Sequence, residues 1–392
     1  MTVADAALLS WAAVVAAVSA VAALRSLRRP RPAAASRPPS ALAGPLLVVR
    51  PCAGAEASLA LTLGSLGALA DDPAHRALVR LRFAVASPAD AAVPAIAAAC
   101  ERFAARGLDA RLVVTGATAP NQKSDQLARV LAAEPGAATV VNVDSDVDLT
   151  TFDWDALLSP LADPGVAAVW APPHEAPGTT PGDRASEALL GGSLHAFTLL
   201  AGIDSGGLVG KVVALRRDAL DAIGGFGSLG HHLGEDMELA RRWRARGARV
   251  VASRGVAVAR VSGRTGPDVA ARYGRWLLVI RAQRPWLLAS YPGLFFATPL
   301  VVLAATGAVL AGRAGAVALG AEALAVGARA LVAWAAARSS GRRGAFGAMA
   351  TDAVLADGLL GWAFARALTS RTVRWRGRAL RVAARGELRD AA

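Results

Sequence analysis

The sequence predicts an α/β protein in which a mostly parallel sheet has helices on both faces and membrane helices flank it at both ends of the chain. Between residues 44 and 285, short apolar runs alternate with helical stretches, which is typical of such a sheet. Outside this region, apolar segments reach the roughly 20 residues that a membrane-spanning helix needs. The mean hydropathy is +0.40 and 54% of the residues are hydrophobic, which indicates that part of the chain lies in lipid.

The N-terminal region, residues 1–29, is predicted to be a transmembrane anchor. Its apolar segment Ala6–Leu24 has no charged residue, and the basic run Arg25-Ser-Leu-Arg-Arg-Pro-Arg follows directly. Because basic residues stay on the cytoplasmic side, the chain after the anchor is expected in the cytoplasm. A cleaved signal peptide is less favoured, since its basic residues would precede the apolar core. Residues 30–43 are rich in Pro and are predicted to be a linker.

Residues 44–285 are predicted to form one α/β domain. The expected strands are Pro45–Arg50, Leu78–Ala86, Ala110–Thr115, Ala138–Val143, Val166–Trp170, Leu208–Leu215 and Arg249–Ala252. The expected helices include Ala55–Ala70, Ala91–Ala105, Gln122–Ala133 and Glu235–Arg246. Since open α/β sheets bind ligands at the carboxyl ends of their strands, the chemistry is expected at that edge.

The C-terminal region, residues 286–370, is predicted to form transmembrane or interfacial helices from the apolar stretches Tyr291–Leu310, Ala314–Ala337 and Phe346–Leu368. If all three crossed the membrane, the basic tail of residues 371–392 would end outside, against the positive-inside rule. We therefore expect that Phe346–Leu368 lies in the interface or re-enters, so that the tail stays in the cytoplasm. The expected location is the cell membrane, multi-pass, with a cytoplasmic α/β domain.

The charge and the cysteines exclude some classes of protein. The net charge of +13 comes almost wholly from Arg, scattered or beside apolar stretches, with no helix-turn-helix or zinc-finger spacing. Nucleic acid is therefore not an expected partner, whereas an anionic membrane or substrate is. Cys52 and Cys100 are too few for a disulfide framework and lack metal-type spacing, so reduced thiols are expected.

One motif places carboxylates at a strand end. The run Val140-Val-Asn-Val leads directly into Asp144-Ser-Asp146. Two Asp side chains one residue apart point to the same side of the chain and can hold a hard divalent cation that also binds a diphosphate. Taken alone, the motif favours an ordinary Asp-rich turn, and the other motifs of the chain reverse this preference.

Other candidate ligands follow the strands or begin helices. Asp90 can accept hydrogen bonds from uracil or ribose, or cap the next helix. Lys123, one of two lysines with Lys211, lies beside a helix N-terminus and can contact a diphosphate or stand in solvent. Glu235-Asp236 begins a helix whose dipole favours acids in any case. His231 and His232 are expected as an exposed pair, and Arg216-Arg217 as residues that cap a strand and face phosphate or lipid headgroups, with no catalytic role.

A helix predicted from Pro267 to Gln283 carries Arg272, Arg275 and Trp276. The two guanidinium groups lie at positions i and i+3 on one face and can bind a diphosphate, while the indole stacks on a sugar or an acceptor. The alternative is an interfacial helix that anchors Arg and Trp among the headgroups.

These motifs together resemble the ceramide glucosyltransferase family, glycosyltransferases with the GT-A fold of the family 2 and family 21 type, including bacterial relatives that act on hopanoids. The matching residues, in order, are Arg50-Pro-Cys-Ala-Gly-Ala-Glu56, Asn121-Gln-Lys123, Asp144-Ser-Asp146, Gly234-Glu-Asp236 and Arg272-Tyr-Gly-Arg275-Trp276, with Val373-Arg-Trp-Arg-Gly-Arg in the tail. The chain departs from the family pattern at three places: only Asp90 stands where a denser acidic patch is usual, Gln126 replaces an Asn, and Tyr273-Gly274 replaces a His-Glu pair.

The resemblance implies an inverting transfer of one sugar, glucose or N-acetylglucosamine, from a UDP-sugar to a lipid hydroxyl of ceramide or a hopanoid polyol. It implies that Asp236 is the general base and that Mg²⁺ or Mn²⁺ binds Asp144 and Asp146. The donor would be held by Asp90, Lys123, Asp144, Glu235, Arg272, Arg275 and Trp276. Two rivals stay open: a processive polysaccharide synthase of the same superfamily, and a non-catalytic lipid-binding scaffold.

Overall fold

The computed structural model describes residues 2–28, 42, 44–204, 206–312, 315–342, 346–375 and 378–390. The chain forms two compact units. The helical unit comprises Met1–Pro30, Thr180–Asp204 and Arg264–Ser370, and the sheet unit comprises Arg31–Thr179, Ser205–Gly263 and Arg371–Ala392. This division differs from the expected domain of residues 44–285, because two of its segments pack with the apolar helices and the tail packs with the sheet.

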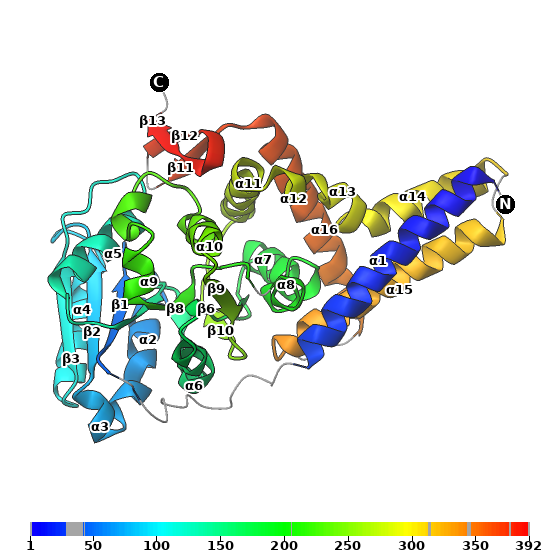
Figure 1. Cartoon of the computed structure of the whole chain (residues 1–392). Helices are drawn as coiled ribbons and strands as arrows, with labels where there is room; N and C mark the ends of the chain where they lie inside the picture. The colour runs from blue at the N-terminus through cyan, green and yellow to red at the C-terminus, as the bar shows by residue number, and fades with distance from the viewer. Residues whose placement is uncertain are drawn as a thin grey trace. The chain divides into compact units, whose positions relative to one another are not determined.

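The sheet unit is built on a seven-stranded sheet with the order β3-β2-β1-β4-β8-β6-β9 (Figure 1). Neighbouring strands are parallel except at β8, which runs antiparallel to both β4 and β6. The expected fold class is thereby confirmed, with all seven expected strands present. The strands are β1 (Leu46–Pro51), β2 (Val79–Val85), β3 (Asp109–Val114), β4 (Thr139–Val143), β6 (Val166–Trp170), β8 (Val212–Arg216) and β9 (Arg249–Ala252).

Helices cover both faces of this sheet. Successive residues of a strand point to opposite sides, so strands that are apolar throughout place apolar side chains on both faces. Leu46 and Val48 of β1 join a large apolar core, while Leu47 and Val49 are buried on the other face. The helices that contribute to this core are α2 (Leu59–Gly64), the 3-10 helix η1 (Ser65–Ala70), α4 (Val93–Ala104) and α6 (Trp154–Leu158). Helix α5 (Gln122–Ala133) also packs on the sheet, and α10 (Glu235–Ala245) lies against β9.

Two small sheets complete this unit. The first has the order β5-β10-β7, from Val147–Asp148, Ala257–Ala259 and Pro173–Glu175, and it holds the chain directly after Asp146. The second is formed by the tail, from β11 (Thr372–Trp375), β12 (Arg378–Val382) and β13 (Leu388–Asp390). The sequence predicted only a basic tail here, so this antiparallel sheet is a new feature.

The tail sheet is hydrogen-bonded to the Gly-rich loop that precedes α10. The amide of Leu388 donates to the carbonyl of His231 at 2.7 Å, and the amide of Leu233 donates to the carbonyl of Gly386 at 2.7 Å. His232 and Glu387 form an isolated β-bridge between these two bonds. The last residues of the chain therefore fix the loop that leads into Glu235-Asp236.

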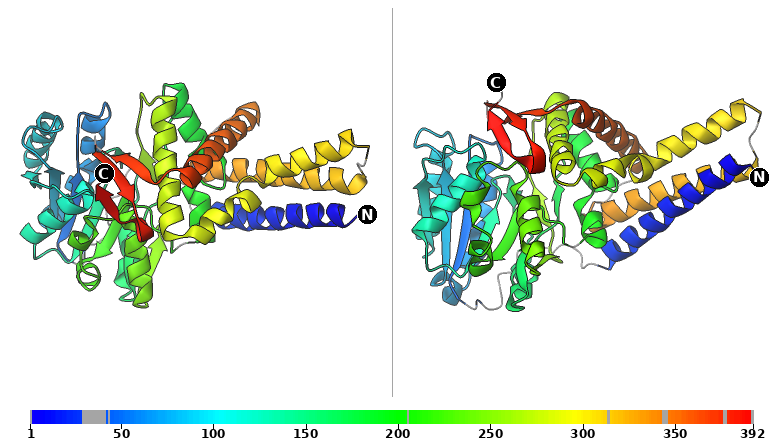
Figure 2. Two further views of the ribbon diagram at one scale, coloured as in Figure 1. Left: turned by 90° about the horizontal axis from the view of Figure 1, so that it is seen from above. Right: turned by 45° about the horizontal axis from the view of Figure 1, so that its top comes forward.

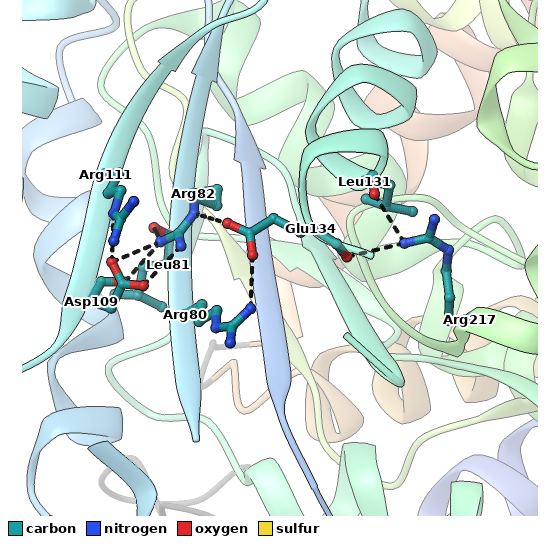
Figure 3. A network of polar contacts seen from close by, with 8 residues as sticks. All are labelled: Arg80, Leu81, Arg82, Asp109, Arg111, Leu131, Glu134 and Arg217. Atoms are coloured by element: carbon teal, nitrogen blue, oxygen red, sulfur yellow. Dashed lines mark hydrogen bonds and ion pairs between the residues drawn. The ribbon is translucent and has the colours of Figure 1, made fainter. Parts of the chain in front are cut away.

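An ion-pair network lies in the amino-terminal half of β2 and β3, away from the carboxyl ends of the strands (Figure 3). Arg82 is buried and binds Asp109 at 2.8 Å and Glu134 at 2.5 Å. Arg217 donates to the carbonyl of Leu131 at 3.1 Å, at the end of α5. The expectation that Arg216 and Arg217 face phosphate is therefore wrong, because the antiparallel β8 ends at the opposite edge of the sheet.

The helical unit contains two sets of packed helices. Helices α1 (Val3–Leu27), α14 (Ala297–Leu310) and α15 (Ala316–Ser339) lie side by side (Figure 2). Helices α7 (Pro181–Gly192), α11 (Gly266–Gln283) and α16 (Phe346–Thr369) pack together. Of the described helices, α1, α15 and residues Ala348–Thr369 are long and apolar enough to span a membrane. Pro285–Leu294 and Ala297–Leu310 form a further apolar pair, bent by 42°.

Several charged residues in or beside the apolar stretches form ion pairs. Arg329 of α15 binds Asp357 of α16 at 3.0 Å, and Arg342 binds Asp352 of α16 at 2.8 Å and Glu187 of α7 at 2.9 Å. Ion pairs of this kind are expected where charges lie within apolar helices. They explain why these stretches differ in sequence from plain lipid-facing helices.

Candidate functional site

The segment that follows β4 places two carboxylates at the carboxyl edge of the sheet. The amide of Asp144 donates to the carbonyl of Lys211 at 2.8 Å, and the carbonyl of Asp146 accepts from the amide of Arg260 at 2.7 Å. The fully buried guanidinium of Arg50, at the end of β1, donates to the carbonyl of Val147 at 3.1 Å. The backbone of this segment is therefore held by three neighbouring parts of the chain.

Lys211 is a residue of this site that the sequence analysis did not assign. Its ammonium nitrogen lies 2.5 Å from Asp146 Oδ1 and 3.4 Å from Asp144 Oδ2. Lys211 belongs to the expected strand Leu208–Leu215, but β8 begins at Val212, directly after it. Because β8 is antiparallel, its first residues lie at the edge where β4 ends. The rarity of lysine in this Arg-rich chain was the available signal.

Lys123, in the first turn of α5, bridges two carboxylates. Its ammonium nitrogen lies 2.6 Å from Asp144 Oδ1 and 3.4 Å from Glu235 Oε1, and it donates to the carbonyl of Gly210 at 2.8 Å. The preceding Asn121 caps α5 and also donates to Glu235 Oε2 at 3.1 Å. The ends of β4, α5 and α10 thus meet around one lysine.

Asp236 faces the same cluster through the backbone of Gly210. Its Oδ2 accepts from the amide of Gly210 at 3.0 Å, and its Oδ1 accepts from the amide of Met237 at 2.8 Å. A side chain at position 210 would meet the Lys123 ammonium at 3.2 Å and the Asp236 carboxylate at 3.4 Å. Glycine at this position therefore allows the lysine and the carboxylate to approach the chain closely.

Burial and neighbouring charges give Asp236 and Asp144 different pKa values. Burial, reinforced by the neighbouring Glu235, raises the pKa of Asp236 to about 6. Burial would also raise the pKa of Asp144, but Lys123 and Lys211 outweigh it and hold that pKa below its ordinary value. Asp144 is thus a permanent anion, whereas Asp236 can exchange a proton near neutral pH, as a general base must.

The structure therefore brings together five of the expected site residues, namely Lys123, Asp144, Asp146, Glu235 and Asp236. Asp90 lies at the same edge of the sheet but follows β2, two strands away from β4. Its Oδ1 accepts from the amides of Gly54 at 2.8 Å and Ala92 at 2.9 Å. Asp90 does not cap α4, because the N-cap of that helix is Ala92 and no side chain caps it, whereas the role of Asp90 as a ligand stays a prediction.

The other three expected residues belong to α11 of the helical unit. The guanidinium carbon of Arg272 lies 4.7 Å from the centre of the Trp276 ring, a cation–π contact. Trp276 also contacts Tyr273, with ring centres 5.0 Å apart. The predicted stacking of Trp276 on a sugar or an acceptor, and the predicted phosphate contacts of Arg272 and Arg275, stay predictions.

A buried histidine in this aromatic cluster was not anticipated. The ring centre of His195 lies 6.4 Å from that of Trp276. Neither ring nitrogen has a hydrogen-bond partner among the residues that the structure describes, and burial lowers the pKa to about 4. His195 is therefore neutral at physiological pH. The only signal in the sequence was this histidine within the largely apolar run Gly-Gly-Ser-Leu-His-Ala-Phe.

The cluster of acids and lysines lies at the carboxyl edge of the sheet, and a comparison with known families shows which family the chain belongs to. The model of the family described as glycosyl transferase family 21 matches residues 8–388. The chain belongs to this family. The expected family is thereby confirmed, and the protein is a glycosyltransferase. The match extends from the N-terminal helix through the tail sheet, so the flanking helices are part of the family's architecture.

Several solved structures of glycosyltransferases are similar to this family 21 chain. A mannosyltransferase, PcManGT from Pyrobaculum calidifontis in complex with GDP-Man and Mn²⁺, is 20% identical with a TM-score of 0.48, covering 92% of this chain and 99% of that one. A glucosyl-3-phosphoglycerate synthase from Mycobacterium tuberculosis, with Mn²⁺, UDP and phosphoglyceric acid, is 21% identical with a TM-score of 0.38, covering 60% and 78%. TarS 1–349 of S. aureus with UDP-GlcNAc is 12% identical with a TM-score of 0.39, covering 88% and 98%. No curated protein matches the chain.

The carboxylates of this family 21 site fit a divalent cation whose remaining ligands come from the substrate. Among the residues that the structure describes, no group of three or more His, Cys, Asp or Glu side chains could hold a metal ion by itself. Asp144 and Asp146, however, share one positively charged group, the ammonium of Lys211. Mg²⁺ is commonly bound by one or two carboxylates together with substrate phosphates. The two aspartates match that arrangement.

Proposed function

We propose that this glycosyltransferase transfers one sugar, glucose or N-acetylglucosamine, from a UDP-sugar to the hydroxyl group of a membrane lipid, with inversion at the anomeric carbon. The observation that carries the proposal is the meeting of Asp236 with Lys123 and Asp144 at one edge of the sheet. It joins a carboxylate suited to accept a proton with groups suited to bind a diphosphate.

The chain's residues have separate roles in this reaction. Asp236 accepts the proton of the lipid hydroxyl as its oxygen bonds to the anomeric carbon, while the bond from that carbon to the diphosphate oxygen breaks. Lys123 lies beside Asp144 and donates to the departing diphosphate. Glu235 holds Lys123 in place from the other side. The bond-forming oxygen and the leaving diphosphate lie on opposite faces of the anomeric carbon, which gives inversion.

A divalent cation, Mg²⁺ or Mn²⁺, would be held by Asp144 and Asp146. When bound, it supplies positive charge that stabilises the leaving diphosphate. Asp90 is proposed to bind the uridine, and Arg272, Arg275 and Trp276 are proposed to bind the diphosphate and the sugar or acceptor. The ion pairs with Lys123 and Lys211 lower the pKa of Asp144, which keeps this ligand ionised for the cation.

The acceptor is proposed to be a lipid with an accessible hydroxyl, such as ceramide or a hopanoid polyol. Three described helices are long and apolar enough to cross a membrane, which supports a membrane-bound enzyme and an acceptor drawn from the bilayer. The basic residues Arg25, in the last turn of α1, and Arg28, at its C-cap, support a cytoplasmic sheet unit, where UDP-sugars are available.

Lipid mass spectrometry tests the proposal. Membranes of cells that express the wild-type chain are compared with those of cells that express Asp236→Asn, a variant with a similar shape that cannot accept the proton. We expect one lipid class to gain the mass of a single hexose or N-acetylhexosamine with the wild type only. A long polysaccharide in place of a single added sugar would favour a processive synthase, and unchanged lipids with retained UDP-sugar binding would favour a non-catalytic scaffold.

A further inference from the structure

The position of Lys211 has a consequence for how the cation and the donor bind. Its ammonium contacts both aspartates, 2.5 Å from Asp146 Oδ1 and 3.4 Å from Asp144 Oδ2, and its side chain is only 15% exposed. The backbone of Lys211 is fixed to the same segment, because its carbonyl accepts from the amide of Asp144 at 2.8 Å. One positive charge therefore already occupies the point that both carboxylates share.

The two lysines of the cluster differ in what holds them. Lys123 is anchored on its far side by Glu235 at 3.4 Å and by the carbonyl of Gly210 at 2.8 Å. Lys211 contacts both carboxylate oxygens of Asp146, whereas Lys123 contacts only Asp144 of the pair that the proposed function assigns to the cation. A divalent cation at Asp146 would repel an ammonium group at contact distance. We therefore expect cation binding to displace Lys211 rather than Lys123.

This inference rests on the proposed function. We propose that Lys211 is an internal counter-ion that holds Asp146 until a divalent cation binds there, and that its released ammonium then binds the diphosphate of the donor. Among the described residues, the ammonium groups that contact Asp144, Asp146 and Glu235 are those of Lys123 and Lys211. A bound divalent cation neutralises the aspartate pair and leaves the Lys211 charge free for the incoming anion.

The chemistry of lysine suits both positions. Its ammonium is a compact charge on a flexible four-carbon stem, so a rotation of the stem can carry it from a carboxylate to a nearby phosphate. The anchored backbone of Lys211 limits that movement to the immediate surroundings of Asp144 and Asp146. Cation and donor consequently assist each other, since the cation releases the lysine and the diphosphate then stabilises the released position.

Direct binding measurements on the full chain in lipid nanodiscs test this role without any turnover. Mn²⁺ is titrated and free Mn²⁺ is followed by electron paramagnetic resonance, first without nucleotide. UDP binding at saturating Mn²⁺ is then measured by calorimetry. The variants are Lys211→Gln and Lys211→Met, which remove the charge at similar length, and Lys211→Arg, which keeps it. Thermal unfolding confirms that each variant is folded.

The account predicts opposite changes in the two measurements. Without UDP, Lys211→Gln and Lys211→Met bind Mn²⁺ about tenfold more tightly than the wild type, because a competing cation is gone. At saturating Mn²⁺, both bind UDP about tenfold more weakly, because a phosphate partner is gone. Lys211→Arg stays closer to the wild type in both.

Other outcomes overturn the inference. If the neutral variants bind Mn²⁺ no more tightly than the wild type, while UDP binding of the wild type is normal, Lys211 is no counter-ion and only this inference fails. If they bind Mn²⁺ more tightly but UDP equally well, the second half of its role is wrong. If the wild type binds neither Mn²⁺ nor UDP, the proposed function fails and the inference fails with it.

Discussion

Asp236 carries the clearest pH dependence of the molecule. Burial raises its pKa to about 6, so a base with this pKa loses its activity as the pH falls through 6. We predict that transfer rises across this range in the wild type. Asp236→Asn should lower kcat by about 10²- to 10⁴-fold, the usual contribution of a general base. The measurement is the pH profile of transfer, and a profile that is flat between pH 5 and 8 would contradict the assignment.

The same carboxylate should reduce stability at neutral pH. A buried acid whose folded-state pKa is raised above its unfolded value favours the folded state when protonated, and this contribution is lost as the pH rises through about 6. Asp236→Asn removes the buried charge, so its Tm at pH 7.5 should exceed that of the wild type, with a smaller difference at pH 5. A lower Tm at pH 7.5 would mean that the carboxylate is stabilised by contacts stronger than those of Gly210 and Met237.

Arg50 is predicted to act as a support for the aspartate segment. Its guanidinium is fully buried and donates to the carbonyls of Thr62 and Val147. Burial lowers its pKa to about 10, so it stays charged at pH 7. Arg50→Met leaves both carbonyls without this donor, at a cost of about 1–3 kcal/mol for each buried group.

Thermal unfolding and the KM for the UDP-sugar check this prediction. Both the Tm and the affinity for the donor should fall in Arg50→Met, because the backbone of residues 144–148 loses the hydrogen bond from Arg50 to the carbonyl of Val147. Arg80→Met serves as the control, since Arg80 is partly exposed and its pairing with Glu134 lies at the other edge of the sheet. An unchanged KM in Arg50→Met would remove Arg50 from the account of the site.

Among the elements, the tail sheet is predicted to control the loop before α10. Residues 386–388 make two backbone hydrogen bonds of 2.7 Å with His231 and Leu233. Deletion of residues 371–392 should therefore speed hydrogen exchange in residues 224–234 and lower kcat, because Asp236 follows this loop directly. UDP binding should change less, since Lys123 and Asp144 belong to other elements.

Hydrogen exchange followed by mass spectrometry measures this effect. Arg389→Ala is the matched control in β13, because Arg389 is exposed and binds only Glu387 among the ion pairs described. It should leave exchange and kcat unchanged. If deletion of the tail left exchange in the loop at its wild-type rate, the tail would have no positioning role.

The elements also show what can be predicted from sequence. Strands and helices follow from apolar periodicity, and α5 begins and ends at the expected residues because Asn121 caps it and its apolar face is regular. The direction of β8 could not be predicted, since a buried strand has the same apolar pattern in either direction. Because β8 is antiparallel, Lys211 lies at the site and Arg217 lies at the opposite edge of the sheet.

The tail and the aromatic cluster show a second limit. Thr372–Trp375 and Arg378–Val382 mix apolar and basic residues without strict alternation, and the hydrogen bonds of residues 386–388 with a loop more than 150 residues away leave no local signal. His195 was missed for the same reason, because its surroundings come from three separate segments. By contrast, the family was predicted correctly, since several short motifs in the right order constrain one another.

At the scale of the whole chain, the tail limits the membrane topology. Because the tail is hydrogen-bonded to the sheet unit, both lie on one side of the membrane, and an even number of crossings must separate them. Helix α14 ends, and α15 begins, at the end of the bundle where α1 begins (Figure 1, Figure 2). We therefore expect α14 and α15 to cross, and α16, which packs on α7 and α11, to stay on the cytoplasmic side.

Cysteine labelling in intact cells tests this topology. With a membrane-impermeant maleimide, Thr2→Cys and Ala311→Cys should be labelled from outside, whereas Arg338→Cys and Arg371→Cys should react only after the membrane is opened. The native Cys100 is an internal control for the cytoplasmic side. Labelling of Arg371→Cys from outside would show that α16 crosses and would contradict the contacts of the tail.

The central claim is that separate acidic groups meet around one cation-bound diphosphate. A structure determined with UDP and Mn²⁺, in which the anomalous signal locates the metal, tests it most directly. We expect the metal between Asp146 and the diphosphate, with Lys123 near the phosphates and Asp236 on the side where the sugar would lie. A diphosphate bound elsewhere, or a metal that touches neither Asp144 nor Asp146, would contradict the account.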